Sequence, residues 1–586
     1  MITAADRSEW HEGHQRRHGD HGHHGHHGDH GHQRREGRRA VVGYPRAVLL
    51  LGVVFCSELL SRPLPAQGPQ RLDGGGILEV GGEAERYLRA LELAGRAPRN
   101  GWTVRPQQPA NGRAFPTDSA HPWKGRWGVA DSGTFSLRLL RPGAKLTWNS
   151  SFPSSDGRGP AWTGRGGTAE LRAGVVARWW RVRMQLAPVA FMSQNSSFAV
   201  ITGSRRGDAA YRDPRFPGNI DLPQRFGDGR YTRVDPGNSQ LALELLGGEV
   251  GVSSAAQVWG PGREYPLVLS GNAGGFPHAF AGTRRPWPIG IGTVQGRVMA
   301  GRPSQSAWSP MAGDPRTRWS MAAVGSFTPR GVPGLEVGGT RFIHGLYRDG
   351  FSVRELRRLV SGGTYTGSGF QNLSSENQMA SLFMRWAFPR AGLEVYGEYF
   401  RDDYSLEARR ALQYFDDLRT YMIGAQRVLS SSPTRLRVLR AELVNGELPL
   451  SNRGERAGNF AGAGSPLPPY PHSGVNQGHT HAGMLLGSPE AYGGAAWRTG
   501  VDQFTPSGRV SITAERALRM DWLPGVAQAR NQVPRDVVYG VGAEAVRFLG
   551  RREVGAALTG MLELNRNLER GTDVPNVRVA VWYRGF

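Results

Sequence analysis

Long runs of alternating apolar and polar residues narrow the folds open to this 586-residue chain. The runs 379–388 and 393–400 are joined by Pro389-Arg390-Ala391-Gly392, and the runs 537–548 and 554–564 by Leu549-Gly550-Arg551-Arg552. Side chains alternate between the two faces of a strand, so these runs predict antiparallel hairpins with four-residue turns. Sandwich strands have ~5–6 residues, whereas a tilted strand that crosses a bilayer needs ~9–11. The lengths therefore predict an all-β fold, a large antiparallel transmembrane β-barrel.

Short turns contrast with the long polar connections 195–238, 354–377 and 445–481. Short turns on one rim and long loops on the other are typical of outer-membrane barrels. In lipid a spanning sheet must close, and its polar side chains then face the lumen. We expect lumen charges on neighbouring strands to pair as ladders, and the residues expected in that role are Glu394, Glu398, Arg435, Arg437 and Arg440.

The chain ends in an alternating run, 577–586, that closes with Phe586. This run resembles the C-terminal strand by which outer-membrane barrels are passed to their insertion machinery, which we therefore expect as a partner. Val577, Val579, Val581 and Tyr583 fall in one register and Trp582 and Phe586 in the other, so a bulge is needed if both sets face lipid.

The N-terminal part divides into three segments before the barrel. Residues 1–34 are a His/Gly-rich tract, which predicts a disordered extension or, alternatively, a metal-binding tail. Residues 35–66 predict a signal peptide, with a basic start, an apolar run 47–55 and a small-residue end at Ala66. Residues 67–130 predict a periplasmic segment with a short helix over 83–96, and residues 131–586 the outer-membrane barrel with long extracellular loops. The single cysteine, Cys56, lies in the signal, so no disulfide framework is expected.

The charge balance is strongly basic, with 72 Lys+Arg against 49 Asp+Glu and a formal net charge of +23. Lys124 and Lys145 are the only lysines, so almost all the positive charge is arginine, which pairs bidentately with carboxylate and phosphate. Export and a barrel fold exclude nucleic acid as the partner. We expect the arginines to meet lumen acids, lipopolysaccharide phosphates in the outer-membrane lipid, and acidic glycan.

Motifs that signal catalysis are absent from the sequence: it has no phosphate-binding loop, nucleophile elbow or His-Glu-x-x-His. The pairs Asp402-Asp403 and Asp416-Asp417 suggest carboxylate catalysis, but neighbours on a strand point to opposite faces. His479-Thr480-His481 resembles half a metal site without a third ligand. We therefore predict a protein that is not an enzyme and that has no cofactor and no metal.

Aromatic and arginine side chains interleave most densely between Trp259 and Trp287. Sugar rings are held by aromatic faces and by planar polar groups on their hydroxyls and carboxylates. An ordinary turn beside a membrane-interface aromatic girdle explains the same composition. Both interpretations stay open for the candidate polysaccharide-binding residues Arg263, Asn272, Arg284, Arg285 and Trp287.

The same stretch resembles the signature of the Wzi-type capsule-assembly outer-membrane family. The resemblance rests on 258–262, 269–278 and 282–286, with flanking matches at 219–227, 394–399 and 472–487. The family motif often has a second Trp where Val258 stands and a second Asn where Gly271 stands. Small residues in the first piece suggest a turn geometry. The residues assigned a structural role in the motif are Trp259, Gly260, Pro261, Gly262, Phe276, Pro277 and His278.

The resemblance implies an outer-membrane barrel of about eighteen strands with a small helical element on the periplasmic side. It also implies a non-enzymatic, lectin-like role in anchoring capsular polysaccharide or exopolysaccharide at the cell surface, and we expect a monomer. An anion-selective porin or transporter is the first alternative, since an arginine-lined lumen passes anions. A secreted β-rich glycan-active enzyme is the second.

Overall fold

A computed structural model describes residues 78–106, 120–124, 134–314, 318–346, 376–402, 415, 419–449, 467–519 and 534–585. The expected extension and signal peptide, Cys56 with them, lie outside the described residues. So do three of the paired aspartates (Asp403, Asp416 and Asp417) and Phe586.

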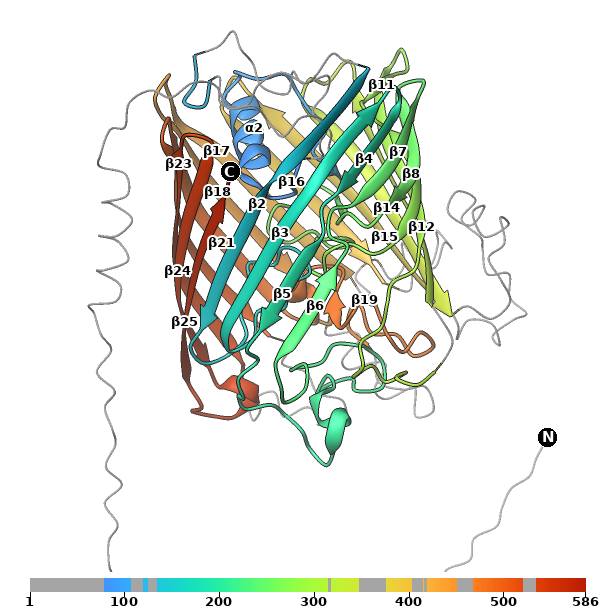
Figure 1. The fold of residues 1–586 in the computed structure, drawn as a ribbon, viewed down its shortest axis with the longest axis vertical. Coiled ribbons are helices and arrows are strands. Elements are labelled where there is room, and N and C mark those ends of the chain that lie inside the picture. The colour runs from blue at the N-terminus through green and yellow to red at the C-terminus, as the bar shows by residue number, and fades with distance from the viewer. Residues whose placement is uncertain are drawn as a thin grey trace, which may run out of the picture. The chain divides into compact units, whose positions relative to one another are not determined.

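The described chain forms a closed antiparallel β-barrel of eighteen strands (Figure 1), as predicted. Three of these strands are each interrupted once. The first nine are β2 (Phe135–Asn149), β3 (Gly166–Trp179), β4 with β5 (Val182–Leu186, Val189–Ser193), β6 with β7 (Tyr231–Asp235, Gln240–Leu245), β8 (Gly248–Ser253), β10 with β11 (His278–Thr283, Trp287–Pro288), β12 (Gly292–Gly301), β13 (Arg318–Pro329) and β14 (Leu335–Leu346). The other nine are β15 (Glu376–Phe388), β16 (Leu393–Arg401), β17 (Arg419–Ser431), β18 (Leu436–Asn445), β21 (Ala495–Thr505), β22 (Gly508–Leu518), β23 (Val537–Leu549), β24 (Arg552–Leu564) and β25 (Val574–Arg584).

Each wall strand pairs with the next along the chain, and β2 pairs with β25 to close the barrel, from Gly143 opposite Arg584 to Asn149 opposite Arg578. The interruptions of the third and fourth strands lie side by side, because Ala187 bridges to Gly237. Pro188 and Pro236 stand at these two breaks, and proline cannot donate to the ladder. The wall is therefore a meander in which the third and fourth strands are interrupted at the same level.

The two rims differ as the sequence predicts. The hairpin β15–β16 turns at 389–392, and β23–β24 turns at Gly550-Arg551, two residues rather than the predicted four. The predicted long connection 195–238 is shorter than expected, because β6 lies within it. Short 3₁₀ helices lie in the long loops, at Gly207–Tyr211, Pro489–Ala491 and Arg566–Leu568. We call the two ends of the barrel the short-turn rim and the long-loop rim.

Apolar side chains cover the outside of the wall strands. The exposed fraction of Leu382 is 70%, and that of Leu171 is 61%, although both are large apolar residues. Further members of this belt are Leu139, Leu146, Ile423, Ile512, Val541 and Val581. An outward apolar band around a closed barrel with a charged lumen fits the hydrocarbon core of a bilayer. The protein is thus located in the bacterial outer membrane.

The predicted lumen ladder is partly confirmed. Glu394 and Arg440 point inward and form buried ion pairs, with Arg385 at 3.0 Å and with Asp502 at 3.1 Å. Glu398 is also buried, but no cation among the described residues lies within 4.0 Å of it. Arg437 was placed wrongly, because the inward residues of β18 are its even-numbered ones. Arg435 lies in the exposed turn before β18 and not in the lumen.

The last strand resolves the register question raised by its sequence. β25 pairs without a bulge with both β24 and β2. Val579, Val581 and Tyr583 are exposed on the outside, so the alternate residues Arg578, Ala580 and Trp582 face inward. An aromatic side chain of the C-terminal strand therefore faces the lumen instead of the lipid.

The helix α2 (Glu83–Leu93) forms within the predicted 83–96 and lies at the short-turn rim, toward the top of Figure 1. It ends three residues early because Gly95 adopts a φ of +69°, which closes the helix through an Arg96 N–H bond to Leu91 O. Its residues 85–93 are all buried. Tyr87 stacks on Trp123 with ring centroids 4.2 Å apart, against Phe504 of β21. The helix thus fills the lumen at this rim.

No helix among the described residues is long and apolar enough to cross a membrane.

Candidate functional site

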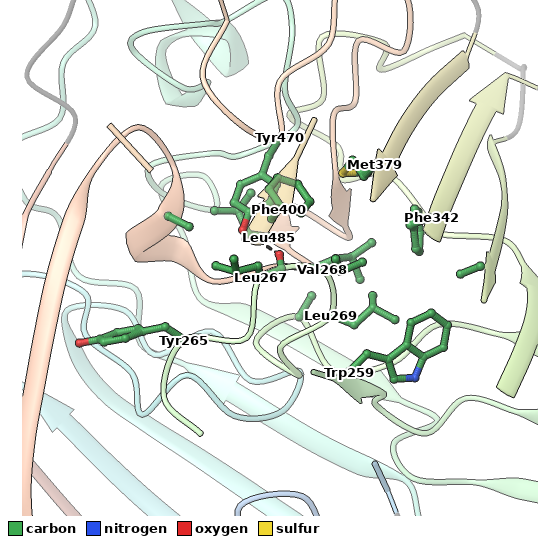
Figure 2. Packing of buried hydrophobic residues seen from close by; sticks show 14 of the residues in the cluster. Trp259, Tyr265, Leu267, Val268, Leu269, Phe342, Met379, Phe400, Tyr470 and Leu485 are labelled. Carbon is green, nitrogen blue, oxygen red and sulfur yellow. Dashed lines mark hydrogen bonds between the residues drawn. The ribbon is translucent and has the colours of Figure 1, made fainter. Parts of the chain in front are cut away.

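The segment 254–277, between β8 and β10, folds into the lumen, and we call it the signature segment. Trp259 is fully buried, and Leu267, Val268 and Leu269 pack beside it. Figure 2 shows Leu267, Val268 and Leu269 below Tyr470, Phe400 and Met379, with Phe342 to the right above Trp259, and all of them belong to one buried cluster. The region that most resembles the family signature is therefore the apolar core of a plug.

The turn after Trp259 is fixed by the N-terminal segment. β1 (Val104–Arg105) pairs with β9 (Val258–Trp259), and Gly260 N donates to Thr103 O at 2.8 Å. Arg89 of α2 donates to Pro261 O at 3.0 Å, and Arg105 donates to Gly260 O at 3.3 Å and also to Gly262 O. Gly260 has a φ of +86°, where a side chain is strained. The carbonyl groups of this turn are thus held by two buried arginines.

The backbone amides that follow the turn bind a carboxylate. Glu442 of β18 accepts hydrogen bonds from the backbone N–H groups of Arg263 at 2.9 Å, Glu264 at 3.0 Å and Tyr265 at 2.6 Å. Tyr396 Oη donates to the same carboxylate at 2.8 Å. Successive amides around an anion form a nest, which fixes the backbone of the signature segment on the wall.

The side chain of Glu264 is held in the same region by two wall arginines. Arg440 Nη1 lies 2.7 Å from one carboxylate oxygen and Arg498 Nη1 2.9 Å from the other. Burial alone would raise the pKa of Glu264, but these two guanidinium groups hold that pKa well below its ordinary value. Glu264 therefore stays ionised inside the lumen.

Residues 467–491, which we call the second plug segment, pack on the signature segment from the long-loop side. Tyr470 Oη donates to Leu267 O at 2.8 Å, the bond drawn in Figure 2. Asn272 Nδ2 donates to Leu485 O at 3.0 Å, and Ser270 N donates to Leu486 O at 2.8 Å. Within it, β19 (Thr480–His481) pairs with β20 (Met484–Leu485). Together the two segments close the middle of the lumen.

Two of the three histidines of the second plug segment, His479 and His481, are buried and neutral. His479 Nε2 donates to Val268 O at 2.7 Å, and His481 Nδ1 accepts from Ser304 N at 2.9 Å. Burial lowers the pKa of each imidazole to about 3. The described residues include no cluster of three or more ligating side chains that could hold a metal ion. Asp402, a candidate acid in the sequence, accepts a hydrogen bond from Tyr470 N at 2.7 Å.

The residues assigned a structural role lie together around the plug. Trp259, Gly260, Pro261, Gly262 and Phe276 are buried, and His278 begins β10 with 5% of its surface exposed, while Pro277 is exposed. Gly271 has a φ of +77°, a conformation that Asn also adopts more readily than other residues. This backbone conformation would accept Asn at the position as well as Gly.

The five candidate polysaccharide-binding residues do not form one surface. Arg263 is half-buried and bonds to Gln426, and Asn272 is buried between the two plug segments. Arg284 pairs with Glu244 at 2.8 Å, Arg285 is exposed, and Trp287 donates to Gly247 O at 3.1 Å. These last three lie at the short-turn rim, on the far side of the plug from the long loops.

Sequence reasoning missed the residues that fasten the plug. Arg89, Arg105 and Glu442 hold its backbone, and Tyr470 spans its two halves. The available signal for Arg89 was that it shares one face of a short helix with Glu85, Arg86 and Glu92, at spacings of three and four residues. The arrangement as a whole can obstruct the lumen and leave the long loops at one rim.

The fold resembles that of a solved outer-membrane protein, over almost the full length of that protein. Wzi of Escherichia coli, an outer-membrane protein involved in group 1 capsule assembly and a carbohydrate-binding β-barrel, aligns with a TM-score of 0.57 and 12% identity, over 87% of this chain and 99% of Wzi. This likeness confirms the fold that the signature resemblance implies. No known protein family matches the sequence, and no curated protein does.

Two outer-membrane proteins of Pseudomonas aeruginosa are more distant. OccK2 aligns with a TM-score of 0.37 and 10% identity, over 77% of this chain and 96% of that protein. OprD aligns with the same TM-score and identity, over 77% and 94%. At this level of similarity neither supports an argument about function.

Proposed function

We propose that the protein holds capsular polysaccharide or exopolysaccharide at the cell surface, as a plugged outer-membrane barrel that catalyses no reaction. The observation that carries the proposal is the plug itself. The signature and second plug segments fill the middle of the lumen with packed apolar side chains, on a fold that covers 99% of the carbohydrate-binding barrel Wzi. Such a lumen suits a protein that works through its outer surface.

Arginines on the long-loop rim support this role. Arg206, Arg230, Arg302 and Arg570 are exposed, and the side chain of each is without a hydrogen bond or ion pair to any described residue. They belong to the loops after β5, β12 and β24. Guanidinium groups bind carboxylate and phosphate bidentately, so this set suits acidic glycan and lipopolysaccharide.

The experiment combines deletion with complementation. In a deletion strain we expect glycan synthesis to continue while cell-associated polysaccharide falls and polysaccharide in the medium rises. The wild-type gene should restore retention, and the variant R206Q/R230Q/R302Q/R570Q should restore little of it at equal protein level. Unchanged cell-associated glycan in the deletion strain would overturn the proposal.

A matched variant tests the other rim. R285Q/R330Q/R390Q/R435Q removes four exposed arginines from the short turns, and we expect it to retain glycan normally. Loss of retention in this variant alone would instead favour the sequence-based candidates around Arg285 and Trp287. We further propose that the protein is a monomer and that its C-terminal strand is read by the barrel insertion machinery.

A further inference from the structure

A polar cavity of about 270 Å³ lies inside the lumen at the seam where β2 and β25 meet. Its wall comes from the inward faces of β2, β3 and β22–β25. Its other sides are the segment 78–83 before α2, the loop 155–160 after β2, and the signature segment at 263–264 and 270–275. Ligand pockets commonly measure about 300–1,000 Å³, so this cavity suits one sugar unit and not a chain segment.

Most charges around the cavity are already paired. Asp156 is bound by Lys145 at 2.6 Å, Glu264 by Arg440 and Arg498, and Glu544 by Arg509. Among the residues that the structure describes, no carboxylate lies within 4.0 Å of the guanidinium of Arg158 or of Arg578. Neither cation is therefore neutralised by a direct ion pair, and the positive charge of both can attract an anion inside the cavity beside Asp156.

The two guanidinium groups reach the cavity from different elements. Arg158 stands on the loop after β2, against Gly81, where an added Cβ would lie 2.8 Å from Arg158 Nε. Gly81 has a φ of +67°, so the backbone there favours glycine and leaves the space to Arg158. Arg578 projects inward from β25. Its Nη2 donates to Thr559 Oγ1 at 3.2 Å, and its Nη1 donates to Ser154 Oγ at 3.4 Å and to Ser155 O.

An aromatic side chain and several hydroxyl groups complete the lining. Trp582 faces inward from β25 and packs over Gly555, where any Cβ would collide with the indole. Thr147, Ser511, Thr513 and Thr559 also line the cavity. An indole can cover the C–H face of a sugar ring, hydroxyls can bond its hydroxyls, and guanidinium groups can bind a carboxylate.

We propose that this cavity binds a sugar unit that carries a carboxylate, of the uronate class. Arg158 and Arg578 hold the carboxylate, Trp582 covers one face of the ring, and the threonine and serine hydroxyls bond the ring hydroxyls. The inference goes beyond the proposed function, because it concerns a site in the lumen and not the outward loops. It stands whether or not the protein retains polysaccharide.

The test is calorimetric titration of the purified full-length protein in detergent with galacturonate, galactose and acetate as probes. We expect galacturonate to bind clearly more tightly than galactose or acetate. R158Q should weaken galacturonate binding by about tenfold or more, because a charge-assisted hydrogen bond to the carboxylate is lost. W582L should weaken it severalfold, and R158K should recover part of the loss caused by R158Q.

Matched controls are R435Q, an exposed arginine in a short turn, and W497L, a tryptophan on the outer face of β21 with 40% of its surface exposed. Both should bind galacturonate like the wild type. If R158Q fails to insert, R578Q removes the other cation. Equal affinity for galactose or acetate, or unchanged binding by the arginine variants, overturns the proposal.

A further titration with trigalacturonate tests whether the natural ligand is a free monosaccharide or the end of a polymer. Tighter binding than the monomer indicates the end of a polymer, and weaker binding indicates a free monosaccharide; both support the site. Failure here is distinguishable from failure of the proposed function, because the titration measures binding of a soluble sugar by the purified protein, whereas the proposed function is tested by the glycan that cells retain.

Discussion

Arg89 of α2 and Glu394 of β16 form an ion pair inside the barrel, with side-chain exposures of 2% and 0%. The guanidinium Nε lies 3.0 Å from the carboxylate, and Nη2 also donates to the carbonyl oxygen of Pro261 at 3.0 Å. Arg385 bonds the other oxygen of Glu394 at 3.0 Å. One buried contact therefore joins the helix, the wall and the turn of the signature segment.

Replacing Arg89 by Met should destabilise the folded barrel strongly. The change leaves Glu394 buried with one cation instead of two and removes the donor to Pro261, and breaking a buried pair costs about 3–5 kcal/mol. Urea unfolding in detergent, followed by heat-modifiable gel mobility, measures the loss. D228N, which breaks an ion pair whose acid is 83% exposed, is the control and should change stability by no more than about 1 kcal/mol. Equal effects of the two variants would contradict the expectation.

Gly260 and Gly290 separate backbone strain from crowding. Both have positive φ, +86° and +79°, so alanine costs roughly 1 kcal/mol of backbone strain at either position. An added Cβ at Gly260 would lie 2.6 Å from Glu398 Oε2, whereas nothing lies within 4 Å at Gly290. G260A should therefore lose roughly 3 kcal/mol in all and G290A only the backbone part. Chemical unfolding of both variants measures the two losses of stability. Indistinguishable unfolding midpoints would show that contact between the added Cβ and Glu398 costs nothing.

The buried histidines make stability depend on pH. The pKa of His479 and that of His481 lie near 3 in the folded protein and near 6.5 when unfolded. Between these values the unfolded chain binds more protons, so stability falls as the pH is lowered below 6.5. Each histidine contributes a slope of about 1.4 kcal/mol per pH unit there. H479Q should flatten the dependence by one such slope in unfolding measured from pH 7 to pH 5, and an unchanged slope would count against the burial of His479.

Conductance distinguishes an anchor from a porin. With the signature and second plug segments packed across the lumen, we expect the purified protein to give no large steady anion current in planar bilayers. W259A, which removes the largest side chain of the plug, should raise conductance or produce intermittent openings. An outer-membrane porin measured in the same bilayers is the positive control. A large steady anion current from the wild type would favour the porin function over the polysaccharide anchor.

Much of the wall could be predicted from the sequence, since alternation is a local property of the chain. The pair β15–β16 lies where the alternation places it, and α2 starts at the predicted Glu83. The side of the wall that an individual side chain faces was harder to predict. Arg437, for example, points outward because Leu436 and Val438 of β18 pack on α2 and so set which residues of the strand face inward. Trp582 faces inward because β25 has no bulge.

The plug could not be predicted in the same way. Its segments are rich in Gly, Pro and polar residues and look like surface loops, because their backbone polar groups bond to side chains far along the chain. Glu442, for example, binds the amide of Tyr265, 177 positions away. Asn272 is a residue type that often binds sugars, yet its side-chain amide donates a hydrogen bond to Leu485 O. The composition of the sequence identified the signature segment as important. Only the tertiary contacts show whether a residue there holds the plug in place or could bind a ligand.

The closure of the wall between β2 and β25 sets an order of assembly. The cylinder shuts only after its final strand has been exported, yet α2 lies within it and binds strands as far apart as β16 and β22. A helix that contacts several strands can enter the lumen most easily before the sheet has closed into a barrel. We therefore expect the seam to be the last joint to form, and the cavity beside it to come into existence only at that step.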